Sequence, residues 1–140
     1  MQLKVKKLRP EAKLPNFAHA TDAGMDLFTA EDFTIAPGEF RQVHTGVAIV
    51  FPAGYVGLIW DKGSVSHVRN LKSMGGVFDA DYRGEYILGF VNVGQEPQTF
   101  AVGDKIAQLL IQKVEHPEIV EVEELDDTAR GEGRFGSTGK

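Results

Sequence analysis

The sequence predicts an all-β fold: a jelly-roll-like β-clip or β-barrel domain with at most one short helix and a flexible Gly-rich C-terminal tail. Three observations lead to this expectation. Short runs of alternating or β-branched residues recur along the chain, turns rich in Gly, Pro and Asp separate them, and no segment has a long helical period. Many short strands with turns at this spacing are typical of a sandwich or barrel.

The expected elements follow in chain order. Breaks at 37–38, 52–54, 94–97 and 103–104 separate the runs, because Gly and Pro interrupt regular structure. Residues 21–27 are expected to form a turn that leads into a strand, residues 64–71 are the best candidate for a short helix, and residues 76–93 are expected to form a β-hairpin. The expected strands are 3–8, 33–36, 40–50, 55–60, 76–78, 86–93, 98–101, 106–114 and 119–125.

Composition excludes several classes of function. The 140 residues are expected to form one β domain over 1–126, followed by a flexible segment over 127–140. No apolar run approaches the roughly 18 residues of a membrane span, and the net charge of −5 argues against nonspecific nucleic-acid binding. The absence of cysteine excludes disulfides and fits a reducing compartment. We therefore expect a cytoplasmic protein that binds neither membrane nor nucleic acid.

The tail over 130–140 combines four glycines, three basic residues, two hydroxyls and one aromatic ring. Such a segment has no apolar face to bury and cannot fold by itself. Its backbone N–H groups, cations and hydroxyls suit phosphates, and the flat ring of Phe135 suits a base. The alternative is a frayed, Gly-rich chain end.

Two aspartates in the centre of the chain are candidate acid–base groups. Asp79 and Asp81 stand between an apolar strand start and the strand expected at 86–93, and along a strand they would point to one face. One such carboxylate can act as a general base on water, while Tyr82 can pack against a flat or sugar-like ligand. The alternative is a solvated hairpin tip, because Asp favours turns.

Polar residues in three other segments are candidates for phosphate or metal contacts. Lys62 and Ser64 stand at the expected helix start and suit a phosphate nest, although Ser64 could simply cap the helix. Strict alternation places Gln108 in one row with Ile106, where its amide needs either a ligand phosphate or a backbone partner. Asp26 follows a turn and is either structural or a contact for hydrated Mg²⁺.

Together and in this order, five segments resemble the five motifs of the trimeric all-β deoxyuridine triphosphatases, the dUTPases. They are residues 23–27, 61–65, 76–84, 103–109 and 130–139, which span nearly the whole chain. The resemblance implies a homotrimer with active sites shared between subunits. It also implies hydrolysis of dUTP to dUMP and pyrophosphate, with Mg²⁺ on the phosphates, in nucleotide metabolism and in the exclusion of uracil from DNA.

The resemblance also implies a role for individual residues. Asp79 is the catalytic base that directs water at the α-phosphorus, and Tyr82 packs under the deoxyribose. The base is read by the central motif and by the residue across from it, which here are Ser73, Gly76, Val77, Phe78 and Ile87. The α- and β-phosphates are held by Lys62, Gly63, Ser64 and Gln108. The tail closes over the nucleotide with Arg130, Phe135, Gly136, Ser137 and Thr138, and Asp26 contacts the metal through water.

The chain departs from the family pattern in three places. Lys62-Gly63-Ser64 stands where the second motif usually reads Arg-Ser-Gly, which replaces a bidentate guanidinium by a point charge and shifts the hydroxyl by one residue. Ser73 replaces an Asn, and Arg134 replaces a Gly. Two alternatives stay open: a dCTP deaminase of the same fold, and a dUTPase-fold regulator that binds nucleotide or protein without efficient turnover.

Overall fold

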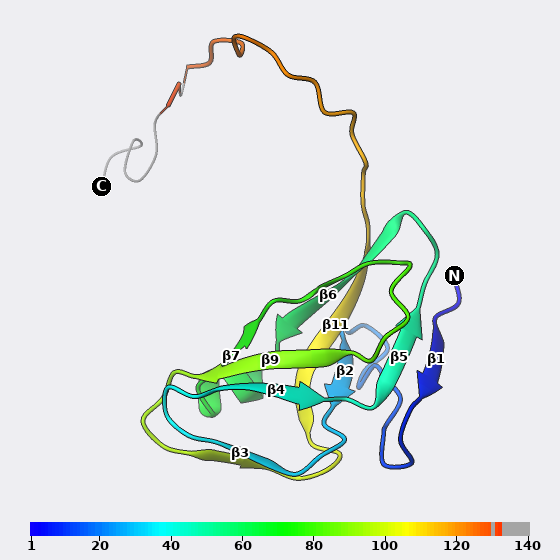
Figure 1. Cartoon of the computed structure of the whole chain (residues 1–140), viewed down its shortest axis with the longest axis vertical. Helices are drawn as coiled ribbons and strands as arrows, with labels where there is room; N and C mark the ends of the chain where they lie inside the picture. Colours follow the sequence, from blue (N-terminus) through cyan, green and yellow to red (C-terminus); the bar gives the residue numbers. More distant parts are fainter. Residues whose placement is uncertain (130, 133–140) are drawn as a thin grey trace.

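The computed structural model describes residues 1–129, 131 and 132. Within them the chain forms short strands and one helical turn, and Figure 1 shows their arrangement. The elements are β1 (Lys4–Lys7), β2 (Met25–Phe28), β3 (Phe33–Ile35), β4 (Phe40–His44), β5 (Val47–Val50), β6 (Tyr55–Asp61), η1 (Ser64–Val68), β7 (Leu71–Met74), β8 (Val77–Phe78), β9 (Ile87–Asn92), β10 (Gln98–Phe100) and β11 (Lys105–Lys113).

The strands pair antiparallel in four small sheets. The largest has the order β2-β11-β6-β8, and a second has the order β4-β9-β7. Two-stranded sheets are formed by β1 with β5 and by β10 with β3. Neighbouring strands in each sheet come from distant parts of the chain, as in Greek-key and jelly-roll folds. The predicted all-β, jelly-roll-like class is therefore confirmed.

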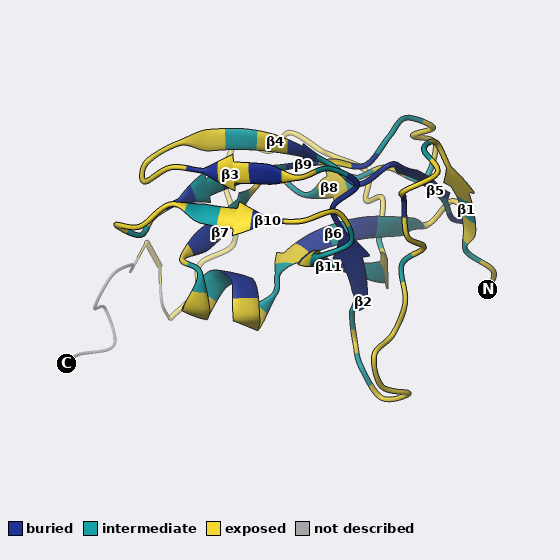
Figure 2. Ribbon diagram, turned by 90° about the horizontal axis from the view of Figure 1, so that it is seen from below, coloured by how far each residue is buried: buried dark blue, intermediate teal, exposed yellow. Residues whose placement is uncertain are grey.

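One hydrophobic core holds these sheets together. Its largest fully buried side chains include Tyr86, Phe90, Leu27, Ile35 and Ile49, which come from several different parts of the chain. Figure 2 shows buried residues on β2, β6 and parts of β3 and β4, and exposed residues on β1 and on most loops. Burial of this kind supplies the main stabilising free energy of the fold.

Two expected elements were divided or shortened. The run expected at 40–50 is divided into β4 and β5, because the chain turns at Gly46, which has a φ of 68° and no space for a Cβ beside Ala12. The helix is shorter than expected, since η1 ends at Val68 and the separate strand β7 follows. None of the helices among the described residues is long and apolar enough to span a membrane.

Two other expectations were wrong. Residues 76–93 do not form a hairpin, because β8 pairs with β6 whereas β9 pairs with β4 and β7. Residues 119–125 form no strand: they follow β11 as an exposed segment that leaves the β domain in Figure 1. Local pattern predicts extended backbone at both places, but pairing depends on which edge is free in the folded domain. The boundary near residue 126 remains a prediction.

Candidate active site

A cleft of about 210 Å³ lies between β4, β7, β8 and β9. The loop over residues 75–76 and strand β8 form one wall, and β9 forms another. Five residues predicted to read a base line this cleft together: Ser73, Gly76, Val77, Phe78 and Ile87. Sequence reasoning missed seven further lining residues. Phe40 and Gln42 are among them because they lie on strand β4, which is distant in the chain, and Gly89 on β9 is another.

Two close backbone approaches shape this cleft. The Gly76 carbonyl accepts a hydrogen bond from the Ile59 amide at 2.8 Å, and a Cβ on Gly76 would lie 3.0 Å from the Ile59 carbonyl oxygen. A Cβ on Gly89 would lie 2.9 Å from the Phe40 ring. Side chains at either position would push β8 or Phe40 out of place, so both glycines are required by the packing around the cleft.

Asp79 follows directly after β8 and is exposed at the edge of the cleft. It stands in a turn and not on a strand, because its carbonyl accepts a hydrogen bond from the Tyr82 amide at 3.2 Å. Asp79 and Asp81 therefore lack the strand geometry predicted to point them to one face. The Tyr82 hydroxyl donates to the Glu85 carbonyl at 3.1 Å, which holds the phenol ring across the same turn.

Aromatic rings pack against one another beside the turn that begins at Asp79. Phe78 stacks on Tyr86 with ring centroids 3.9 Å apart, and Tyr82 lies tilted 5.8 Å from Phe78. Burial raises the pKa of Tyr86 well above its ordinary value, so its hydroxyl stays neutral. The stacking of Phe78 on Tyr86 holds the end of β8 in place, and so sets the position of the turn that begins at Asp79.

A second polar cluster lies around Asp26 on β2. Lys62 Nζ donates a hydrogen bond to Asp26 Oδ1 at 2.6 Å. Lys105 Nζ lies 2.6 Å from Oδ2, as an ion pair whose angle departs from hydrogen-bond geometry. Burial alone would raise the pKa of Asp26, but Lys105 and Lys62 outweigh it and lower the pKa below its ordinary value. Asp26 is therefore a buried anion shared by two lysines.

Gln108 lies beside this cluster, opposite both Asp26 on β2 and Trp60 on β6. Its Nε2 donates to the Asp61 carbonyl at 2.8 Å, so the backbone partner that the sequence left open is present. The second N–H and the carbonyl oxygen of the amide remain for other contacts. The Asp61 carboxylate in turn accepts from the amide and hydroxyl of Ser73, at 2.9 and 2.6 Å.

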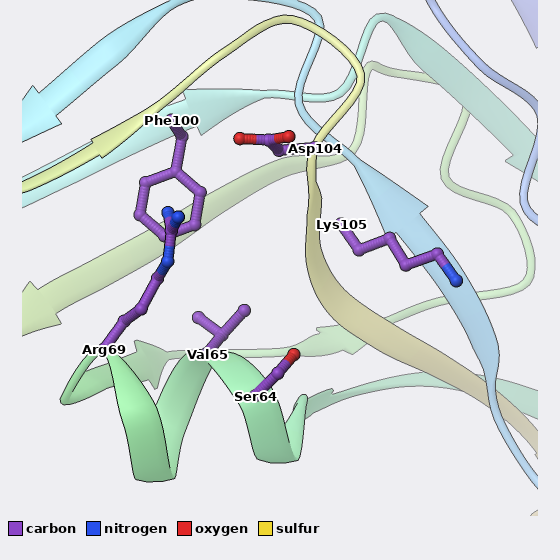
Figure 3. Close-up of a pocket in the computed structure, with 6 residues that line it drawn as sticks. All are labelled: Ser64, Val65, Arg69, Phe100, Asp104 and Lys105. Atoms are coloured by element: carbon purple, nitrogen blue, oxygen red, sulfur yellow. The ribbon is translucent and has the colours of Figure 1, made fainter.

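Ser64 does not cap η1, because Gly63 occupies the N-cap and no side-chain capping bond forms. Ser64 instead lines a pocket of about 260 Å³ together with Arg69, Phe100, Asp104 and Lys105. Figure 3 shows the Arg69 guanidinium over the Phe100 ring and Lys105 directed away from that pair. The Arg69 Nη1 also donates to the Thr99 carbonyl at 2.9 Å, which fixes this wall of the pocket.

Asp79 and the polar cluster around Asp26 lie toward opposite ends of strand β6. Phe78 pairs with Gly57 near the start of β6, and Asp79 continues in that direction. Lys62 follows the last residue of the same strand. At about 3.3 Å per residue, the levels of Asp79 and Lys62 differ by about 20 Å along β6. A single chain therefore does not bring its candidate base and its candidate phosphate ligands together.

The described residues do not offer a metal site of their own. They contain no group of three or more His, Asp or Glu side chains that could hold an ion. Both oxygens of Asp26 already contact ammonium groups, so Asp26 does not fit direct coordination of Mg²⁺. The predicted contact through water remains a prediction. The predicted tail contacts of Arg130, Phe135, Gly136, Ser137 and Thr138 lie outside the described residues.

Comparison with known proteins gives one consistent family. A family model described as dUTPase matches residues 10–139. The deoxyuridine 5'-triphosphate nucleotidohydrolase of Corynebacterium glutamicum is 46% identical, with 99% of this chain and 95% of that protein covered. The enzyme of the same name from Clostridium kluyveri is 43% identical, with 99% of each chain covered.

Solved structures agree with the sequence relatives. The Staphylococcus bacteriophage 80alpha dUTPase with dUpNHpp is similar at a TM-score of 0.93 and 32% identity, with 99% of each chain covered. A mutant dUTPase from phage phi11 of S. aureus, described with a structural Mg(II) ion, is similar at a TM-score of 0.85 and 30% identity, with 91% of this chain and 100% of that one covered. Motif order, fold and full-length similarity together establish that the chain belongs to the dUTPase family.

Proposed function

We propose that this protein hydrolyses dUTP to dUMP and pyrophosphate. The observation that carries the proposal is the position of Asp79, which leaves strand β8 directly at the edge of the cleft lined by Gly76, Val77 and Phe78. A carboxylate held at the mouth of a base-sized cleft is placed to act on the phosphate nearest the nucleoside. Family membership supplies the substrate class.

Each part of the nucleoside has a matching surface in this cleft. Uracil is bound by backbone groups of residues 76–79 and by Ile87, because fixed N–H and C=O groups match its O4 and N3–H. The narrow loop and β9 exclude a C5 methyl group. The Tyr82 ring packs under the deoxyribose, and its hydrogen bond to the Glu85 carbonyl keeps it in place.

The chemical step is an in-line attack of water on the α-phosphorus. Asp79 accepts a proton from the water as the new bond between the water oxygen and the α-phosphorus forms. The bond between the α-phosphorus and the oxygen that bridges to the β-phosphate breaks, which releases pyrophosphate. Lys62, Ser64 and Gln108 bind the α- and β-phosphates, with Gly63 allowing close approach. Arg130, Ser137 and Thr138 bind the terminal phosphates, while Phe135 and Gly136 cover the base.

We further propose that the active enzyme is a homotrimer with shared active sites. The separation of Asp79 from Lys62 along β6 supports an active site shared between subunits. A second subunit can bring its Lys62 and the polar cluster around Asp26 to the Asp79 of the first. Exposed apolar surface supports association: Val77 and Trp60 are 70% and 55% exposed on the sheet, and Ile119 is 95% exposed on the segment after β11.

Magnesium is proposed to enter with the nucleotide. A triphosphate carries Mg²⁺ on its own oxygens and reduces the repulsion toward attacking water. Entry of the metal with the nucleotide agrees with the state of Asp26. This buried carboxylate lies beside the proposed phosphate ligands and is already paired with two lysines. The contribution of the chain would be a contact from Asp26 through a metal-bound water.

The cellular role would be to remove dUTP from the cytoplasmic nucleotide pool, so that uracil is not incorporated into DNA, and to supply dUMP. A pyrophosphate-release assay with dUTP, dCTP and dTTP in the presence of Mg²⁺ tests the activity. We expect release from dUTP alone. Deamination of dCTP would identify a deaminase, and binding of dUTP without turnover would identify a nucleotide-binding regulator; either result contradicts the proposal.

A further inference from the structure

We infer that Glu85 is a positioning residue of the active site. It anchors the far end of the turn that carries Asp79 and Tyr82, and through Tyr82 it sets the discrimination between a deoxyribose and a ribose. This inference rests on the proposed function, because Tyr82 is proposed to pack under the sugar of the nucleotide. Glu85 comes after the third of the five segments that carry the family resemblance, and none of the five includes it.

The turn over residues 79–84 is held mainly at its two ends. At its start, Phe78 pairs with Gly57 on β6. Within the part of the chain that the structure describes, the hydrogen bonds formed by residues 79–84 reach no further than residue 85. The position of the turn relative to the cleft therefore depends on what holds residue 85.

The side chain of Glu85 ties this end of the turn to the corner between β4 and β5. Its Oε1 accepts a hydrogen bond from the Gly46 amide at 2.8 Å, and its Oε2 lies 3.0 Å from His44 Nδ1. Because an ionised carboxylate only accepts hydrogen bonds, His44 Nδ1 is the donor. Arg9 adds an ion pair at 3.7 Å, and the Glu85 side chain is 15% exposed. Such charge-assisted contacts are stronger than neutral hydrogen bonds and little screened by salt.

The backbone beside Glu85 is held at the same corner. The Tyr86 amide donates to the Val47 carbonyl at 2.9 Å, and the Tyr86 carbonyl accepts from the buried Thr45 hydroxyl at 2.6 Å. Loss of the Glu85 carboxylate would leave these two bonds in place. The fold should therefore survive such a change, while the turn before Glu85 gains freedom.

The ring of Tyr82 depends on this anchor. Its hydroxyl donates to the Glu85 carbonyl at 3.1 Å, and the ring lies so close to Gly84 that a Cβ there would overlap the hydroxyl. Tyr82 is 41% exposed, so burial alone does not hold the ring. Its position follows the backbone of residues 84 and 85, which the Glu85 side chain fixes to the corner.

A shift of this ring has a specific chemical consequence. A ring packed under the deoxyribose leaves no room for a 2′-hydroxyl, so the preference for dUTP over UTP depends on where the ring lies. Misplacement of a positioning group by about 1 Å can cost about 10²-fold in rate. A purely structural role for Glu85 would lower the rates with both substrates by the same factor, whereas a displaced Tyr82 changes their ratio.

The test compares two substrates that differ only in the 2′-hydroxyl. We would measure kcat/KM for dUTP and for UTP by pyrophosphate release with Mg²⁺, in the wild type, Glu85→Ala and Glu85→Gln. We expect Glu85→Ala to lower the ratio of the two kcat/KM values, dUTP over UTP, by about tenfold or more. Glu85→Gln should restore part of the ratio, because its amide oxygen can still accept from the Gly46 amide.

Asp32→Ala is the matched control. The Asp32 carboxylate accepts a hydrogen bond from the Val102 amide at 2.8 Å, so this variant also loses a carboxylate that holds a distant backbone segment. Asp32 is exposed and lines no part of the cleft, and its loss should leave the ratio unchanged. Urea unfolding verifies that each variant is folded in the assay.

His44→Leu gives a second, milder variant for the case that Glu85→Ala does not fold. Leucine cannot donate to Glu85, so we expect the ratio to fall by about threefold or more. An unchanged ratio in a folded variant, or an equal loss with both substrates, would overturn the inference. A wild type that releases no pyrophosphate from dUTP refutes the proposed function, whereas wild-type turnover with an unchanged ratio in Glu85→Ala refutes only the role of Glu85.

Discussion

Gln108 donates a hydrogen bond from its side-chain Nε2 to the backbone carbonyl of Asp61 at 2.8 Å. This contact joins the middle of β11 to the end of β6, so the amide has a fixed orientation before any ligand binds. The carbonyl oxygen of the same amide approaches Gly24, where a Cβ would lie only 2.8 Å from it. The turn before β2 therefore sets the space available to Gln108.

Gly24→Ala should displace the Gln108 amide and lower kcat/KM for dUTP by about tenfold or more, because a small misplacement of a positioning group is costly. The added methyl group would also meet Leu110 at 3.0 Å. Steady-state kinetics gives the measurement. Gly38→Ala is the control: it strains a turn with a φ of 74° but meets no atom within 4 Å, so stability should fall by about 1–2 kcal/mol with activity retained.

Asp79→Asn should lower kcat by about 10²–10⁴-fold, because an amide cannot accept the proton from water. Binding of dUpNHpp should persist, since the substituted side chain keeps the size and exposed position of the native one. Stopped assays of pyrophosphate release and calorimetric titration measure the two quantities. Asp81→Asn, in the same turn, should leave turnover near that of the wild type. Unchanged turnover in Asp79→Asn would remove the assigned base.

Acid should destabilise the fold through Glu85. Burial alone would raise the pKa of Glu85, but His44, the Gly46 amide and Arg9 lower it overall. A carboxyl group with a lowered folded-state pKa contributes stability above its unfolded pKa, and this is lost as pH falls through the folded value. Glu85→Gln should therefore be less stable than the wild type by about 1 kcal/mol at pH 7, and the difference should shrink as pH falls below about 4.

Urea unfolding at several pH values measures that difference, with Glu118→Gln on the exposed segment after β11 as the control. A difference that stays constant between pH 7 and strongly acidic pH would contradict the role of the Glu85 carboxylate. The lowered pKa values of Asp26 and Asp61 predict that the wild type itself loses stability over the same acidic range.

Truncation after Ala129 should remove most dUTP hydrolysis and leave the β domain folded. The hydrophobic core is formed by residues up to Ile111, so the urea midpoint should match that of the full chain. Arg130, Ser137 and Thr138 are proposed to bind the terminal phosphates, and a segment that orders on the nucleotide can close a site against water. Full activity in the truncated protein would instead support a frayed chain end.

The residue types and their order in the chain were enough to predict the all-β class, most strand positions and the family. Strand positions follow from local alternation and from turns at Gly and Pro, which depend on nearby residues only. The residues predicted to read a base line one cleft, because residues 73–78 are close in sequence and β9 returns beside β7. Asp79 could be singled out because its motif is a short continuous segment.

Other features arose only when distant segments packed together. The bulge at Ile106 places Lys105 instead of Ile106 on the face of β11 that carries Gln108. Strict alternation along one strand cannot reveal it, since a bulge is defined by the partner strand. Strand β8 pairs with β6 and not with β9, because the strand edge that is available for pairing depends on how all strands of the sheet pack. The separation of Asp79 from Lys62 has the same origin, because the register of β8 against β6 places these two residues toward opposite ends of β6.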